Sequence, residues 1–174
     1  VGKMAFDSIT TDYYINGKPE MTGSYIHGMK NGPFIYYFPN GQIFLRSEYC
    51  NDNRVGTWTE YYRSGVVKRE VRYAKNKEIL VQYNDSTGNY LLKNNSCSYR
   101  LNYENNNYYD SSKTLAIFGG IDSYKMAGKI SNGLKDGTWV LRKNKSLYGK
   151  TKYESGTFVK GYIVFSESKL PITN

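Results

Sequence analysis

The chain has 174 residues, enough for one domain or one short repeat array with a core of moderate size. Aromatic residues make up 16% of it, with 19 Tyr, beside 17 Gly and only 4 Pro, which favours short strands and tight turns over helices. No apolar run approaches the ~18 residues that a membrane-spanning helix needs, and two cysteines are too few for a disulfide framework.

The net charge of +9 has two interpretations. A basic chain attracts anionic neighbours such as lipid headgroups, nucleic acid or an acidic protein. The same charge also keeps a tyrosine-rich surface in solution. The chain begins with Val1 rather than Met, which suggests that an upstream segment such as a signal peptide has been removed. We therefore favour the cell envelope or the exterior over the cytoplasm, and the sequence leaves open whether Cys50 and Cys97 pair.

From residue 13 the sequence repeats itself every 24 residues. Residues 32–41 and 56–65 align without a gap, and Tyr49 and Tyr73 continue the same register. A fixed period of this size is typical of repeat architectures, in which each unit stacks on its neighbours.

Each unit predicts a β-hairpin. The Asn-Gly pairs at residues 16–17 and 40–41 indicate two-residue turns of type I′, in which both residues take positive φ. In the strand before the second turn, Phe34 points to one face and Tyr37 to the other. Units stacked in register would line up Phe34 with Trp58, so that aromatic ladders build a core that no single hairpin could form.

The period blurs in a middle region rich in Asn, Ser and Tyr, where we expect irregular loops between strands. It returns when residues 128–139 match residues 23–34 position for position. We therefore expect an all-β protein, an elongated single sheet or open solenoid of consecutive β-hairpin repeats of about 24 residues. The predicted organisation is a single repeat domain over 1–174, with clear repeats over 13–79, an irregular middle over 80–113, divergent repeats over 114–165 and a loose tail over 166–174.

The best copy, residues 56–65, reads Gly-Thr-Trp-Thr-Glu-Tyr-Tyr-Arg-Ser-Gly and resembles a MORN repeat (membrane occupation and recognition nexus) in its bacterial variant. Residues 32–41 fit with Phe34 in place of Trp, and residues 137–139 open a divergent copy. The resemblance implies a β-hairpin repeat fold. By analogy alone, it also implies a role as an antitoxin component, in protein scaffolding or in membrane attachment.

The sequence offers no candidate catalytic or metal site. Its one histidine, His27, lies in a turn where the later copy has Asn132, which favours a turn former over a catalyst. Glu48, Glu60 and Glu70 lie in extended segments, where pairing with Arg or Lys across strands is expected. No Cys and His residues have metal-ligand spacing. We therefore predict a protein that is not an enzyme and that binds no cofactor.

Two sets of side chains are candidate binding residues. In the aromatic set, one member of each pair must face the core, and the others would form an exposed row suited to protein contacts or, as a third option, to sugars or peptides. The basic set could collect phosphates or an acidic partner, although charges on half-exposed strands also serve simply to prevent aggregation. The aromatic set is Tyr36, Tyr37, Tyr61 and Tyr62, and the basic set is Arg63, Lys68, Arg69, Arg72, Lys75 and Lys77.

Our leading hypothesis is a non-enzymatic β-repeat protein that binds another protein across its sheet, in an antitoxin-like or immunity-like role. The alternative is a peripheral module that binds an anionic membrane or a cell-envelope polymer through the basic set, with an affinity that falls at high salt. Nucleic acid is disfavoured as a partner, because no recognition helix or known nucleic-acid-binding motif is visible.

Overall fold

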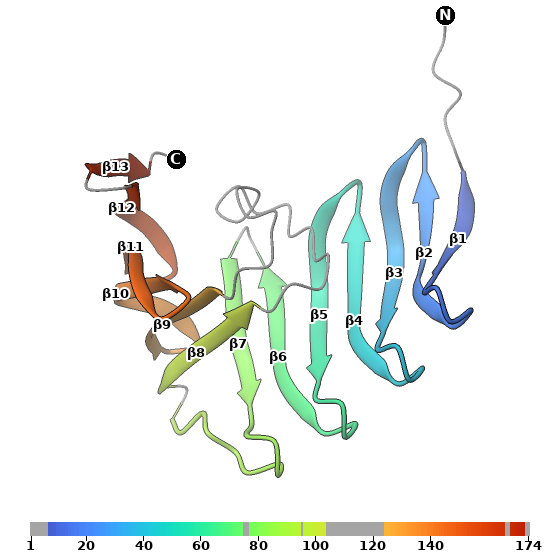
Figure 1. Cartoon of the computed structure of the whole chain (residues 1–174), viewed down its shortest axis with the longest axis horizontal. Coiled ribbons are helices and arrows are strands. Elements are labelled where there is room, and N and C mark those ends of the chain that lie inside the picture. The colour runs from blue at the N-terminus through green and yellow to red at the C-terminus, as the bar shows by residue number, and fades with distance from the viewer. Residues whose placement is uncertain (1–6, 75–76, 95, 104–123, 166–167, 173–174) are drawn as a thin grey trace, which may run out of the picture. The chain divides into compact units, whose positions relative to one another are not determined.

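The computed structural model describes residues 7–74, 77–94, 96–103, 124–165 and 168–172, and it contains strands and no helix in these ranges (Figure 1). The strands are β1 (Ser8–Tyr13), β2 (Pro19–Ile26), β3 (Met29–Tyr37), β4 (Ile43–Cys50), β5 (Asn53–Tyr61), β6 (Val67–Ala74), β7 (Lys77–Tyr83), β8 (Cys97–Tyr103), β9 (Tyr124–Ser131), β10 (Leu134–Lys143), β11 (Ser146–Glu154), β12 (Thr157–Phe165) and β13 (Ser168–Ile172).

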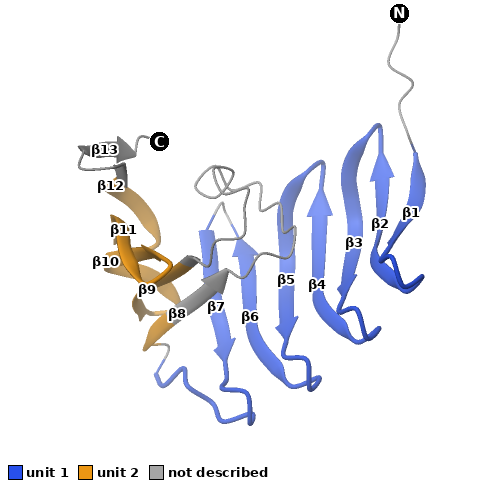
Figure 2. Ribbon diagram, viewed as in Figure 1, with its two compact units in different colours: residues 1–95 blue, residues 96–174 orange. Residues whose placement is uncertain are grey.

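The strands form two antiparallel sheets in which neighbours in the sequence are neighbours in space. The order is β1 to β7 in the 7-stranded sheet and β8 to β13 in the 6-stranded sheet. Each sheet belongs to its own compact unit, residues 1–95 and residues 96–174 (Figure 2). The prediction of an all-β fold built from consecutive hairpins is confirmed, and the first sheet is not closed into a barrel.

Where the sequence predicts one continuous sheet, the strands divide at the end of β7. The next residues fold back on that strand instead of extending the ladder, because Leu91 N–H donates to the Tyr83 carbonyl (2.7 Å) and Asn84 forms a β-bridge with Tyr90. Leu92 is almost fully buried at 1% exposure. The break falls in the Asn-rich and Tyr-rich region where the period blurs. At the other end, part of the tail predicted to be loose forms β13, which pairs with β12.

The Asn-Gly loops join strands as predicted, but the predicted turn type is wrong. In the loop from Phe38 to Gln42, the Gly41 N–H donates to the Phe38 carbonyl (2.7 Å), and positive φ occurs only at Gly41 (91°). This geometry is a type I turn followed by a left-handed glycine. A type I′ turn with Asn40 and Gly41 at its centre is excluded because Asn40 does not have the positive φ that this turn requires. The loop over residues 14–18 has the same hydrogen bonds.

Type I′ turns occur instead at the opposite end of the hairpins. Both turn residues have positive φ in the pairs at residues 27–28 (52° and 75°), 51–52 (49° and 63°) and 132–133 (51° and 77°). His27 and Asn132 therefore occupy equivalent left-handed positions, in which Asn is the more usual residue. The interpretation of His27 as a turn former agrees with this geometry.

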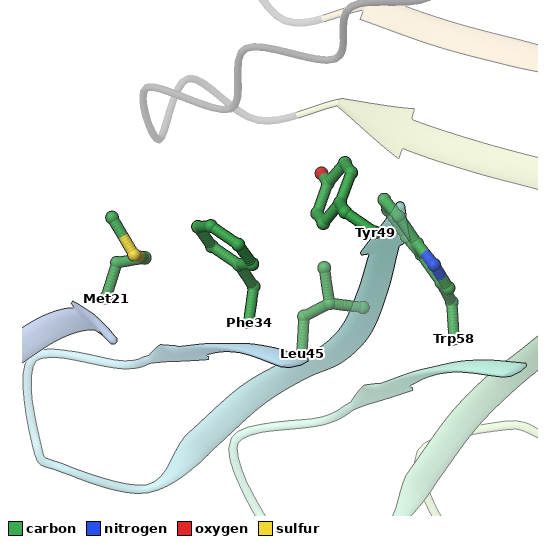
Figure 3. Close-up of a cluster of buried hydrophobic side chains, with 5 residues drawn as sticks. All are labelled: Met21, Phe34, Leu45, Tyr49 and Trp58. Atoms are coloured by element: carbon green, nitrogen blue, oxygen red, sulfur yellow. The ribbon is translucent and has the colours of Figure 1, made fainter. Parts of the chain in front are cut away.

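The core of the first sheet is an aromatic ladder on one face, which we call the aromatic face. It runs from Tyr25 to Phe34, Tyr49, Trp58 and Tyr73, with successive ring centroids 5.4, 5.1, 5.0 and 5.0 Å apart. One ring comes from each of β2 to β6. Figure 3 shows Phe34, Tyr49 and Trp58 of this ladder. The expected alignment of Phe34 with Trp58 is therefore indirect, because Tyr49 from the intervening strand lies between them.

A glycine beneath the ring recurs in both units. A Cβ atom at Gly23 would overlap the ring of Phe34, and one at Gly128 would overlap the ring of Trp139. Gly23 is directly opposite Phe34 in the β2–β3 ladder. The absence of a side chain lets the ring lie flat on the neighbouring strand, and Phe34 and Trp139 are both fully buried at 0% exposure.

Candidate functional site

The structure separates the four candidate tyrosines by face. Tyr36 packs on the aromatic face, where its ring stacks on Phe34 at 6.5 Å. Burial raises the pKa of the Tyr36 hydroxyl far above its usual range, and the neighbouring Tyr49 makes a smaller contribution in the same direction. By strand alternation, Tyr37 and Tyr61 point away from this core, to what we call the opposite face, and both are half-buried.

Tyr62 takes part in a contact between hairpins. Its hydroxyl donates to the carbonyl of Asn84 at 3.0 Å. The hydroxyl of Tyr14 makes a similar bond to the carbonyl of Tyr37 at 2.6 Å. Both residues begin a hairpin loop and hold it to the next hairpin. Tyr36 and Tyr62 thus have structural contacts, and Tyr37 and Tyr61 remain as candidates for binding.

The opposite face carries one continuous row of side chains across the sheet. Each member of this row is directly opposite the next in the strand pairing, so the row crosses all 7 strands. Its members are Thr11, Thr22, Ile35, Arg46, Thr59, Glu70 and Gln82. Most are half-buried residues with short or branched side chains, and Tyr37 and Tyr61 lie two residues from Ile35 and Thr59.

Two members of the basic set are bound to a buried carboxylate. Glu60 is 7% exposed, its Oε1 lies 2.6 Å from Lys68 Nζ, and its Oε2 lies 2.5 Å from Arg69 Nε. Burial raises the pKa of Glu60, but the charges of Arg69 and Lys68 and their hydrogen bonds outweigh it, so the net shift is downward. The expectation that Glu60 pairs with basic residues across strands is confirmed.

The triad Glu60, Lys68 and Arg69 occupies positions that the preceding repeat fills with apolar side chains. Subtracting the period of 24 residues leads to Tyr36, Phe44 and Leu45. The pairing of Glu60 with Arg69 repeats that of Tyr36 with Leu45. Phe44 in the first repeat and Lys68 in the second have no direct partner in the ladder. Each is the extra residue of a β-bulge, and the bulge lets its side chain join the aromatic face.

The other basic residues do not gather with this triad. Arg63 is exposed and its guanidinium lies 5.5 Å from the ring centroid of Phe38. Arg72 is exposed, and by alternation from Val71 it points to the opposite face. Lys77 is half-buried on β7, and Lys75 lies outside the described residues. The basic set is thus distributed over both faces and a loop.

A recurrent cation over two aromatic rings is the feature that sequence reasoning missed. The amine of Lys30 lies 5.3 Å from the ring centroid of Phe34 and 4.9 Å from that of Tyr49. In the next repeat Arg54 lies 5.1 Å from Trp58 and 5.5 Å from Tyr73. Burial lowers the pKa of the Lys30 amine, while the nearby Asp52 opposes this shift.

The second unit contains the same arrangement. Lys135 lies 5.4 Å from the ring centroids of both Trp139 and Tyr153. In every case the cation precedes the first aromatic residue by four positions, and it comes soon after the type I′ turn. This spacing was a signal in the sequence, but only the strand pairing shows that the cation contacts a second ring on the next strand.

The described residues hold no group of three or more His, Cys, Asp or Glu side chains that could bind a metal ion. Cys50 and Cys97 are both free. Across the described ranges, no helix has the length and apolar character needed to cross a membrane. No protein-family model matches this chain, and a search of curated proteins gives no significant match. The resemblance to MORN repeats therefore rests on the residues of this chain alone and stays a prediction.

Proposed function

We propose that this chain is a non-enzymatic β-repeat module that binds another protein across the opposite face of its first sheet. The observation that carries the proposal is the row from Thr11 to Gln82, which crosses all 7 strands of that sheet. Every described strand of the first unit belongs to this one sheet, so no second layer of strands from that unit lies over the face. A broad face of this kind suits a protein surface better than it suits a small molecule.

The composition of the face supports a protein partner. Tyr37 and Tyr61 offer large rings that lose little conformational entropy on binding, and Ile35 and Thr59 supply flat, branched contacts between them. Arg46, Glu70 and Arg72 add charges of both signs, which favours specificity over attraction to a uniformly anionic surface. The resemblance to the bacterial repeat variant extends this proposal to an antitoxin-like or immunity-like role.

The membrane alternative has weaker support. Its motivation is the net charge of +9 and the basic set. The ion pairs of Lys68 and Arg69 with Glu60 reduce the free charge that this set could offer to lipid headgroups. Binding to an anionic membrane through the remaining cations would weaken steeply between low and high salt, whereas an aromatic protein interface would persist.

The test is photo-crosslinking in the cells that make the protein. A photoreactive phenylalanine analogue placed at position 37 or 61 should capture one discrete protein, and the same analogue at the exposed Leu147 should not. Purified partner should then bind the double variant Tyr37→Ala, Tyr61→Ala about 30-fold more weakly, the loss expected for a central aromatic contact.

The control is Tyr90→Ala, because Tyr90 is an exposed tyrosine of the same unit that belongs neither to the row nor to a strand of the sheet. Capture of the same protein from all three sites, or unchanged affinity of the double variant with its fold intact, would refute the proposal. Binding to anionic vesicles at low salt, with no protein captured, would replace it with the membrane alternative.

A further inference from the structure

The two edges of the first sheet differ in how they end. At the β7 edge, residues 84–94 fold back, and Leu91 donates a hydrogen bond to Tyr83. At the other edge, β1 pairs with β2, and no other described strand pairs with its second side. An edge strand presents a row of N–H and C=O groups that can pair with a further strand.

The β1 edge also exposes a cluster of large apolar side chains. Ile9 and Tyr13 on β1 are 77% and 62% exposed, Ile15 in the following loop is fully exposed, and Ile26 at the end of β2 is 44% exposed. These make up half of the large exposed apolar side chains in the described ranges. Proteins usually protect an edge strand with Lys, Pro or a bulge. β1 reads Ser-Ile-Thr-Thr-Asp-Tyr and has neither Lys nor Pro, and its ladder with β2 is irregular only at its end, between Asp12 and Tyr13.

We propose that β1 is a self-association site, at which β1 of a second copy of this chain pairs in antiparallel orientation and continues the sheet across a two-fold axis. The direction of the strands favours this occupant. Because all neighbours in the sheet are antiparallel, β1 and β7 run the same way. Stacking β7 of one copy on β1 of the next would therefore give a parallel pair, whereas two β1 strands related by a two-fold axis pair antiparallel, like every other pair in this sheet.

The residues of β1 select one register. With the two-fold axis at Thr11, Ile9 of each copy lies opposite Tyr13 of the other. These are the two apolar side chains that β1 exposes most. A shift of the register by one residue would place each apolar side chain against a residue on the other face. The register centred on Thr11 is therefore the one in which the exposed apolar groups cover each other.

Disulfide trapping tests the register directly. In the full chain with Cys50→Ser and Cys97→Ser, the variant Thr11→Cys should form a disulfide-linked dimer under mild oxidation, since directly opposed residues have Cα atoms about 4.5–5.5 Å apart. Ile9→Cys and Tyr13→Cys should crosslink poorly alone but efficiently when the two proteins are mixed. The control Leu147→Cys, exposed in the second unit, should stay monomeric.

Sedimentation velocity gives an independent measurement without cysteines. An interface of this size is small, so we expect the mass to double only as the concentration rises. Ile9→Lys should abolish the doubling, and Val159→Lys, the same kind of apolar-to-charged change at an exposed site of the second unit, should not. A mass that stays monomeric at every concentration would overturn the proposal. So would Ile9→Cys crosslinking with itself as efficiently as Thr11→Cys, because that result would show random contact or another register.

Discussion

Removing the charge of Glu60 is the sharpest test of how the first sheet is held together. The variant Glu60→Gln leaves Lys68 and Arg69 beside each other without their carboxylate. Breaking a fully buried ion pair from one side costs about 3–5 kcal/mol. The side chains of Lys68 and Arg69 are each 22% exposed, so water screens part of this cost, and we expect a loss of about 2–3 kcal/mol. For a unit of this size, that corresponds to a decrease in Tm of roughly 8–24 °C.

Thermal unfolding followed by circular dichroism measures this decrease, and hydrogen exchange should localise the loss of protection to β5 and β6. The control is Glu154→Gln. Glu154 and Lys152 are also joined by an ion pair (2.9 Å), but their side chains are 63% and 45% exposed, so we expect no measurable change there. A variant Glu60→Gln as stable as this control would show that the triad is not a buried, compensated cluster.

The preceding repeat supplies a second variant that keeps this reasoning testable. The triple change Glu60→Tyr, Lys68→Phe, Arg69→Leu installs the apolar residues of the equivalent positions. Replacing a buried ion triad with well-packed apolar residues is often neutral or stabilising, so we expect the triple variant to be at least as stable as the wild type. If it were as unstable as Glu60→Gln, the two sites would not be structurally equivalent.

The same carboxylate predicts a dependence on pH. The pKa of Glu60 is lowered in the folded chain from an ordinary value of 4.5, despite the opposing effect of burial. Its contribution to stability is therefore fully present above about pH 4.5 and is lost as the pH falls through the lower folded-state pKa. Urea unfolding between pH 3 and 6 should show this loss in the wild type. The variant Glu60→Gln should lack that component.

Three further predictions concern the aromatic face. Gly23→Ala should lower the free energy of unfolding by about 1–3 kcal/mol, because the new Cβ overlaps the Phe34 ring, and urea unfolding will measure this against the wild type. Lys30→Met should cost about 0.5–2 kcal/mol in the same assay, through loss of the cation above the rings of Phe34 and Tyr49. Burial, and after it the charge of Glu78, raises the pKa of Tyr73 to about 12. The free energy of unfolding should therefore be unchanged below pH 10 and should fall as the pH rises toward 12. Urea unfolding measures this fall, and tyrosinate absorbance follows the ionisation.

The repeat architecture was predictable because the period is written directly in the sequence. Aromatic positions 24 residues apart, with a glycine-containing loop after each, leave little choice beyond consecutive hairpins. The turn type was not predictable from the Asn-Gly pair alone, because the turn closes one residue earlier, between Phe38 and Gly41, and the side chain of Asn40 accepts a hydrogen bond from the Gln42 N–H (3.1 Å). The same local signal therefore gives a hairpin with a different loop.

The faces on which the basic residues lie depend on the register between β5 and β6, which the sequence alone did not define. Alternation alone puts Lys68 and Arg69 on opposite faces of β6. The ladder shifts between Glu60 and Tyr61, and this bulge brings Lys68 to the same carboxylate as Arg69. A one-residue irregularity thus turns an expected surface charge into a half-buried ion pair. Bulges of this kind follow from the fit between neighbouring strands and leave no clear mark in a single strand.

Comparison of the repeats within the chain separates what each hairpin needs from what it tolerates. The position of Tyr36 holds Glu60 in the next repeat, and there the chain compensates with two cations on the neighbouring strand. The position of Lys30 holds a cation in two further copies, as Arg54 and as Lys135. Within the described part of each unit, no second layer of strands covers these rings, and the long stem of a Lys or Arg can cover them while its charge stays at the surface. The recurrent cation therefore covers the pair of rings beneath it. This role explains why Lys30, Arg54 and Lys135 are all basic, although the side chain at the position of Tyr36 changes between repeats.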